Sequence, residues 1–207
     1  MAINSKIDIC NLALGHLGNY GSIADIDNPA LDKEVIFALW YDITRENLLK
    51  AMMPNFALSR RLVSELVTEI AFGYEHAFEY PSDCLKVLGL GNVDQRAEYK
   101  YSIEGNKVYT DDEWSDGMQL RFIKNITDVG MMSAEFKMAL SLQLAANVCL
   151  PITQDVNKKK ALEAQAVLKN MEASSLNAQE NRPIRISKSK FMASRYNSTL
   201  STDSEKK

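Results

Sequence analysis

The sequence is poor in the residues on which most metal sites and many enzymes depend. It has only two histidines, His16 and His76, and neither has a second His or a Cys at a metal-ligand spacing. The three cysteines, Cys10, Cys84 and Cys149, lie far apart and form no CxxC pair. An odd, sparse set argues against a disulfide framework and fits a reducing compartment. We therefore expect free, buried thiols and no metal or cofactor.

Long apolar runs are also absent. No segment approaches the roughly 18 apolar residues that a membrane-spanning helix needs, so we expect no contact with a membrane. Asp8, Asn11 and His16 interrupt the apolar residues near the N-terminus, which argues against a signal peptide. Hydrophobic residues still make up 46% of the chain, which excludes disorder throughout.

Motifs for nucleotide binding and for hydrolysis are missing. The glycines at 15–18 and 89–91 complete neither GxxxxGK[ST] nor GxGxxG, and the chain has no GxSxG motif. We interpret His76 as a packed or hydrogen-bonded core imidazole, and His16 as an ordinary residue near a helix end.

One acidic run, residues 111–116, requires a separate test. Its acids are adjacent rather than alternate, and the twelfth position from Asp111 is Phe122, so it does not fit a calcium loop. Asp111 and Asp112 would point to opposite faces of a strand, which argues against an acid–base pair. We expect a solvated turn here and no catalytic residues.

Charge is divided unevenly along the chain. The net charge is −3, whereas a sequence-specific nucleic-acid binder is usually clearly basic. Residues 181–207 hold seven Lys or Arg and two acids, a net of +5. The first 180 residues therefore hold 17 basic and 25 acidic residues, a net of −8. The sequence predicts an acidic body with a basic C-terminal segment.

Apolar residues recur at three- and four-residue steps in four segments. This period predicts helices over about 4–18, 29–50, 133–150 and 153–178. Asn4 or Ser5 should cap the first helix, and Asn28 the second. The second helix should bury a stripe that comprises Val35, Ile36, Leu39, Trp40 and Ile43.

Prolines set several of the predicted boundaries. Pro29 fits the first turn of the second helix, Pro54 should break or redirect that helix, and Pro151 should end the third. Residues 55–66 then read as a further helical or irregular segment.

The middle of the chain changes to a two-residue period. Aromatic residues and His76 alternate over 72–80, which predicts a strand with one buried face. Gly105 lies between two alternating runs and indicates a hairpin. Residues 85–90 read as a strand or short helix, and in 118–123 we expect Met118, Leu120 and Phe122 to point inward.

These patterns predict an α+β protein: a helical bundle core with an inserted antiparallel β appendage and an extended C-terminal arm. The main domain would span 1–180, with its helical core in 1–70 and 130–180 and its β insert at about 72–124. The arm, 181–207, loses the helical period.

The order of several short motifs then points to a family. They are NLALGHLG at 11–18, IADID at 23–27, WYDITRENLL at 40–49, PNFA at 54–57 before Arg60-Arg61, FEYPSDCLKV at 78–87, ITD at 126–128 and a helix starting near Phe136. In this order, over about residues 3–180, the chain resembles the tail tubular protein A family of short-tailed bacteriophages. It departs from the family at Met52-Met53, where relatives commonly carry a tryptophan.

The resemblance implies a structural virion protein, a head-to-tail adaptor in the tail or neck. Such a subunit would assemble in the host cytoplasm into a ring, usually of twelve copies, between the portal protein and a tail nozzle protein like tail tubular protein B. Double-stranded DNA would pass through the ring during genome ejection. An acidic body suits that channel, because a like-charged wall does not hold DNA. The family implies no catalytic residues.

The C-terminal arm mixes cations with apolar residues, which suits docking onto an acidic neighbour. We expect it to bind the portal through Arg182, Ile184, Arg185, Ile186, Lys188, Lys190, Phe191, Arg195 and Tyr196.

Two other functions stay open at this point. One is a non-viral helical binding or assembly module with a basic tail, and the other is a small hydrolase that uses the carboxylates of 111–116. Particle size would separate a ring subunit from a regulator, and an activity screen would address the hydrolase.

Overall fold

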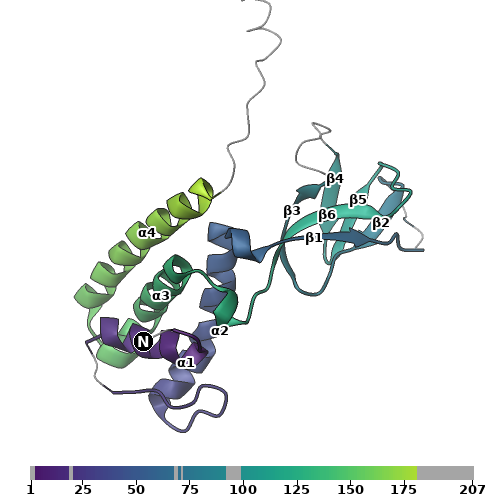
Figure 1. Cartoon of the computed structure of the whole chain (residues 1–207). Coiled ribbons are helices and arrows are strands. Elements are labelled where there is room, and N and C mark those ends of the chain that lie inside the picture. The colour runs from purple at the N-terminus through teal and green to yellow at the C-terminus, as the bar shows by residue number, and fades with distance from the viewer. Residues whose placement is uncertain (1–2, 19–20, 68–69, 71, 92–98, 181–207) are drawn as a thin grey trace, which may run out of the picture. The chain divides into compact units, whose positions relative to one another are not determined.

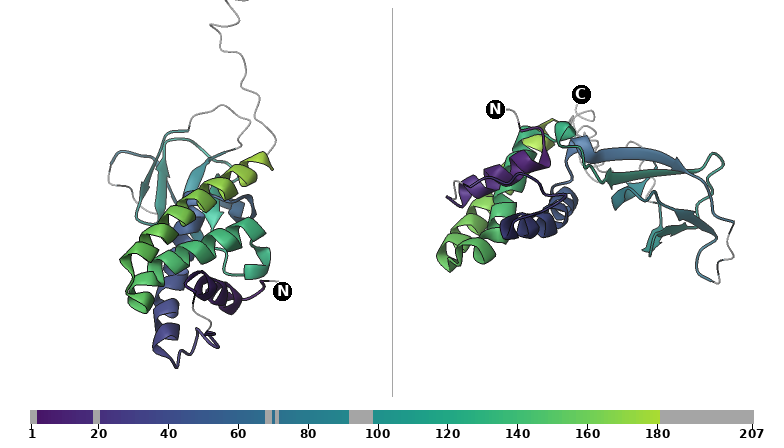
Figure 2. Two further views of the ribbon diagram at one scale, coloured as in Figure 1. Left: turned by 90° about the vertical axis from the view of Figure 1, so that its left-hand side faces the viewer. Right: turned by 90° about the horizontal axis from the view of Figure 1, so that it is seen from below.

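The computed structural model in Figure 1 describes residues 3–18, 21–67, 70, 72–91 and 99–180. Within these residues the chain forms four α-helices and two three-stranded antiparallel sheets, which confirms the predicted α+β class. Met1–Asn177 is one compact unit, and Ala178–Lys207 is a second. Figures 1 and 2 show the helices packed together as one group and the strands as another. The predicted arm lies outside the described residues.

The first helix, α1 (Lys6–His16), begins where the sequence predicts. The Ser5 hydroxyl accepts a hydrogen bond from the Asp8 N–H at 3.1 Å, and the Asp8 carboxylate accepts one from the Ser5 N–H at 3.0 Å. This reciprocal pair satisfies two N–H groups that the helix itself leaves without partners.

The second helix, α2 (Asp32–Met52), starts later than predicted. The expected cap at Asn28 with Pro29 in the first turn is wrong, because Glu34 supplies the cap from inside the helix. Its carboxylate accepts hydrogen bonds from the N–H groups of Ala30 at 2.9 Å and Leu31 at 3.1 Å. A third bond, from the Ala24 N–H at 3.1 Å, ties the preceding loop to the same carboxylate.

The buried stripe predicted for α2 is also wrong. The helix buries its opposite side, through Phe37, Tyr41, Leu48 and Leu49. Ile36 is partly buried against the core, and the other four predicted residues are exposed: Val35, Leu39, Trp40 and Ile43. Because both sides of α2 are apolar, the period alone cannot say which side meets the core.

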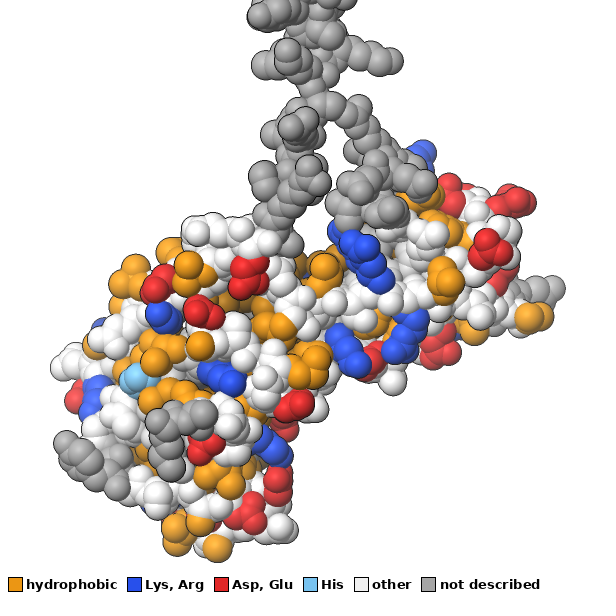
Figure 3. All heavy atoms as spheres, in the orientation of Figure 1, with side chains coloured by type: hydrophobic (Ala, Val, Ile, Leu, Met, Phe, Trp, Pro, Cys, Tyr) orange, Lys and Arg blue, Asp and Glu red, His pale blue; other side chains and the backbone are white. Residues whose placement is uncertain are grey.

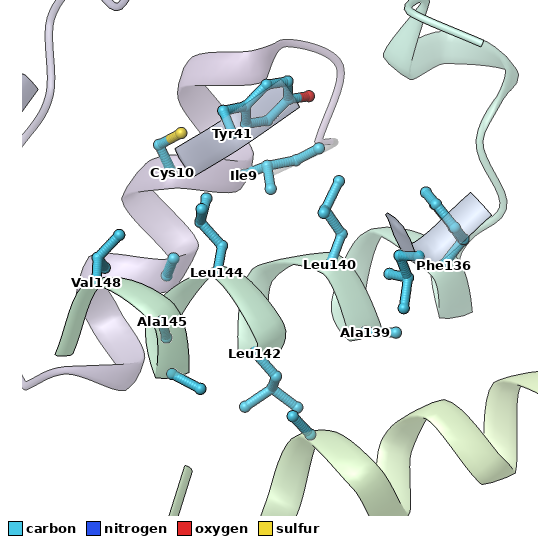
Figure 4. Close-up of a cluster of buried hydrophobic side chains, with 14 of the residues drawn as sticks. Ile9, Cys10, Tyr41, Phe136, Ala139, Leu140, Leu142, Leu144, Ala145 and Val148 are labelled. Carbon is cyan, nitrogen blue, oxygen red and sulfur yellow. The ribbon is translucent and has the colours of Figure 1, made fainter. Parts of the chain in front are cut away.

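The third helix, α3 (Ala134–Thr153), is the centre of the helical core. Figure 4 shows Leu140 and Leu144 pointing toward Ile9 of α1 and Tyr41 of α2, while Leu142 points toward the opposite side. By length and composition alone α3 is apolar enough to span a membrane, although the sequence analysis expects no such segment. In the structure, 56% of its most apolar window is buried inside the protein. That burial accounts for its apolar composition.

The prediction that Pro151 ends α3 is wrong, because this residue lies inside the last turn of the helix. A proline at this position has no N–H to donate, and its ring crowds the preceding turn, yet the helix continues through it to Thr153. The helix ends at Gln154, whose φ of +54° is left-handed, and the Thr153 hydroxyl donates to the Cys149 carbonyl at 2.8 Å.

The fourth helix, α4 (Val156–Gln179), follows after a short turn. Within the described part of α4, only Leu162, Ala166 and Ala173 are buried. These residues lie on one side of the helix, so most of its circumference faces outward.

The strands form two sheets. Sheet A has the order β1 (Leu58–Val63), β6 (Met118–Lys124) and β3 (Cys84–Leu90), and sheet B has the order β2 (His76–Glu79), β5 (Lys107–Thr110) and β4 (Tyr101–Glu104). Short 3-10 turns at Asn55–Ala57 and Val129–Met131 precede β1 and α3. The β4–β5 hairpin turns at Gly105, with a φ of +61°, as predicted.

Two sequence expectations for the strands need correction. β1 occupies residues for which the sequence predicts a helical or irregular segment. The β region therefore begins at Leu58 and not at about residue 72. The strand predicted over 72–80 covers only His76–Glu79, and Phe72 is exposed. Met118, Leu120 and Phe122 do point inward, and they form a second core with Phe78.

A buried polar contact joins the helices to sheet A. Arg45 of α2 is almost fully buried, and its guanidinium lies 3.1 Å from the Asn125 Oδ1 at the end of β6. The Asn125 amide donates to Glu46 Oε1 at 3.1 Å. Because a buried guanidinium needs partners, this contact holds the end of β6 against α2.

Candidate interaction surfaces

His76 has a structural partner. Its Nδ1 lies 2.7 Å from Glu65 Oε1, and this hydrogen bond raises the pKa of His76 above its ordinary value of 6.5. The pair lies where the chain after β1 bridges to β2, through Glu65 and Phe78. Within the described residues, no three His, Cys, Asp or Glu side chains lie close enough to hold a metal.

The carboxylates of the acidic turn hold its local conformation. Asp111 Oδ1 accepts from the Glu75 N–H at 3.3 Å, and Asp112 Oδ2 accepts from the Thr110 hydroxyl at 3.1 Å. The two aspartates thus bond to different partners. Over the described part of the chain, no acid of 111–116 forms an ion pair.

Cys10 is buried, and Cys84 and His16 are partly buried. Burial raises the pKa of the Cys10 thiol to about 12 and that of Cys84 to about 11, so both stay protonated and unreactive near neutral pH. His16 is half-buried beside Ser141, with 3.2 Å between its Nε2 and the serine Oγ. Burial lowers the pKa of His16, so this side chain is part of the packing between α1 and α3 and not the ordinary helix-end residue that the sequence predicts.

The nine predicted portal-binding residues, from Arg182 to Tyr196, all lie outside the described residues. The structure therefore offers different candidates, on the helices and on sheet A.

The first candidate is the outward face of α2, formed by Val35, Leu39, Trp40 and Ile43. Leu39 is 66% exposed and Ile43 is 55% exposed. Their spacing of four residues places them in one row along the helix. The outward face of α2 is therefore a continuous apolar strip rather than scattered single residues.

The outward face of α4 is the second candidate, formed by Val167, Leu168 and Met171. Leu168 is 68% exposed and Met171 is 64% exposed. These residues lie on the side of α4 opposite the buried Leu162 and Ala173. In Figure 3, hydrophobic side chains are visible over the region where Figure 1 places α4.

A groove of about 600 Å³ lies between the two helices. Its walls come from Leu48 and Met52 of α2 and from Val167 and Met171 of α4. A second hollow of about 310 Å³ continues along the same helices, and Trp40 lines it. Its floor is polar, with Gln143 and Asn147 of α3 and Asn170 of α4 among its residues. The groove borders Val167 and Met171 of the outward face of α4, and the adjoining hollow borders Trp40 of the outward face of α2.

Sheet A carries the third candidate, a concentration of positive charge. Its three strands contain Arg60, Arg61, Lys86, Arg121 and Lys124, and they contain no acidic residue. Figure 3 shows Lys and Arg side chains grouped where Figure 1 places these strands. This patch belongs to a body whose net charge is −8, so its sign is opposite to that of its surroundings.

No family model matches this chain, and no curated protein is similar to it in sequence. Its function is therefore inferred from these surfaces together with the order of the sequence motifs.

Sequence reasoning missed all three surfaces. The apolar residues of α2 were recognised but assigned to the core. The arginines of β1 were recognised as a basic pair but were not placed on a strand, although Leu58, Arg60 and Leu62 do alternate with Ser59, Arg61 and Val63.

Proposed function

We propose that this chain is a structural virion protein, a head-to-tail adaptor subunit that forms a ring between the portal and the tail nozzle. The observation that carries the proposal is the pair of outward apolar faces on α2 and α4. A protein that works alone rarely exposes contiguous apolar strips, whereas an assembled subunit buries them against its neighbours. The order of the sequence motifs, which resembles that of the tail tubular protein A family, supports a head-to-tail adaptor in particular.

Two different faces on one chain suit a ring. When one surface of a subunit binds a different surface of the next copy, the contact repeats and closes if the rotation allows. The outward face of α2 would contact the α4 side of the neighbouring copy, next to the groove. Twelve copies is the number that the family resemblance implies.

The charge distribution supports a channel whose wall does not bind DNA. The first 180 residues carry a net −8, and a negative wall lets double-stranded DNA slide without sticking. In this arrangement sheet A should face protein rather than DNA, because it holds five cations and no acids. The basic residues 181–207 would contribute the portal contact.

Two experiments test the proposal. Light scattering of the purified chain, alone and with portal protein, should give a monomer or a ring of about a dozen copies, and no dimer. Electron microscopy of purified particles that carry a label on this chain should place the label at the neck. Purified particles that lack the chain would refute the proposal and favour a non-viral binding module.

A further inference from the structure

Sheet A has an open face on which two arginines lie directly opposite each other. In the antiparallel register of β1 and β6, Arg60 pairs with Arg121. Directly opposed residues project from the same side of a sheet, and opposed like charges destabilise it. At one end of this face Ile123 is covered by the helical core, and from Arg121 onward the face opens to solvent.

The two arginines differ from the other cations of the sheet. Arg61 and Lys124 share Asp83, at 3.7 Å and 3.5 Å. Arg60 and Arg121 form no ion pair with any residue that the structure describes, and the Nε of Arg121 is buried without a hydrogen-bond partner. A buried donor without an acceptor is costly. Within the described residues, the two guanidinium groups therefore lack a negatively charged hydrogen-bond acceptor.

A hollow of about 260 Å³ lies at this point. Its lining includes Arg60, Arg121, Leu62, Gln119 and Gly91. The planar guanidinium binds carboxylates with two parallel hydrogen bonds, so a pair of them can hold one or two carboxylates. The hollow is large enough for acidic side chains to enter.

The apolar residues beside the arginines favour a protein over a nucleic acid. Leu62 is 60% exposed, and Leu58 is exposed on the same face. Arginine is enriched in protein interfaces, whose buried centre is apolar, whereas single-stranded nucleic acids are held by aromatic residues that stack on bases. We therefore assign the ligand class as protein carboxylates.

We propose that the Arg60–Arg121 pair binds the acidic turn, residues 111–116, of a second copy of this chain. Outside the strands of sheet A, the first 180 residues hold 12 basic and 25 acidic residues, so one chain carries both halves of a complementary pair. Asp111, Glu113 and Asp116 are exposed and form no ion pair within the described residues. This contact rests on the proposed ring, since it supplies a second bond between identical copies.

A charge-swap experiment tests the contact. The first variant carries Arg60→Glu and Arg121→Glu, and the second carries Asp111→Arg and Glu113→Arg. Sedimentation velocity at low salt measures self-association of each full-length variant. Each variant alone should associate more weakly than the parent chain by roughly 30-fold or more, because each opposes like charges at the contact. An equimolar mixture should recover association, since every contact then joins opposite charges.

A matched control carries Lys100→Glu and Lys107→Glu, which changes the net charge equally in the region of sheet B. Its association should stay close to that of the parent chain. If the first variant does not fold, Arg60→Gln with Arg121→Gln replaces it, and the loss of association should persist.

Three results would overturn the contact. One is an arginine variant that associates as strongly as the parent chain, and another is a mixture that fails to recover association. The third is a loss of DNA binding by the arginine variant without a loss of self-association, which would assign the arginines to phosphates. None of these refutes the adaptor role, because that role is tested separately by the presence of the chain in particles.

Discussion

Replacing Leu39 and Ile43 together by glutamine should leave the isolated chain folded but weaken its association with other copies. Both side chains point outward from α2 and are 66% and 55% exposed. Glutamine is a good helix former, so the helix itself should tolerate both changes. Substitutions at exposed positions usually change the free energy of unfolding by less than about 0.5 kcal/mol.

The expected loss of association follows from the exposed area. Complete burial of a Leu or Ile side chain contributes about 1.5–3 kcal/mol. Covering the exposed parts of both residues in an interface would therefore contribute roughly 2–3.5 kcal/mol, which corresponds to a roughly 30- to 400-fold weaker contact after substitution. Sedimentation velocity of the two chains at matched concentrations measures this difference.

Leu49→Ala serves as the contrasting variant. Leu49 lies on the buried side of the same helix and is fully buried. Its truncation should cost about 2–5 kcal/mol of folding free energy, so thermal melting should distinguish it clearly from the double glutamine variant. The reasoning is refuted if the double variant melts as low as Leu49→Ala, or if it assembles as well as the parent chain.

Four further predictions concern the rest of the chain. Ser5→Ala should lower the free energy of unfolding by about 1 kcal/mol in chemical denaturation, because it removes the cap of α1; an unchanged midpoint would contradict that cap. NMR titration should give His76 a pKa above 6.5 that falls in Glu65→Gln, and the stabilisation from the pair should be complete below pH 6.5 and lost as pH rises through the folded pKa. His76→Ala should lower stability without abolishing any turnover, and a measurable activity lost with the fold intact would overturn the non-enzymatic interpretation. Deleting 181–207 should leave a folded chain that no longer joins portal-containing heads, and normal joining would show that the arm does not dock there.

Local signals along the chain were enough to predict most of the fold. The four helices, the β4–β5 hairpin at Gly105 and the inward residues of β6 all follow from period, caps and turn chemistry. The wrong predictions concern features that depend on contacts between segments far apart in the chain. Glu34 replaced the expected cap at Asn28 because its carboxylate collects N–H groups from three positions that only the folded loop brings together.

The candidate surfaces could not be predicted from the sequence for a related reason. Apolar residues lie on both sides of α2, and both sets fit a helical period. Only packing shows that Phe37 faces the core while Leu39 does not. The opposition of Arg60 and Arg121 depends on strand register across a separation of about 60 residues, which no local pattern encodes. The charge asymmetry between body and arm, by contrast, can be read directly from composition.

In the ring that we propose for the phage neck, the outward faces of α2 and α4 are contact surfaces between identical copies. A cryo-electron microscopy reconstruction of the neck in purified particles tests it most directly. We expect a ring of this chain between portal and nozzle, with Leu39 and Ile43 of each copy covered by its neighbour on the side of Leu168 and Met171. A ring in which these residues face solvent would refute the proposed contact, and a neck without this chain would refute the adaptor role.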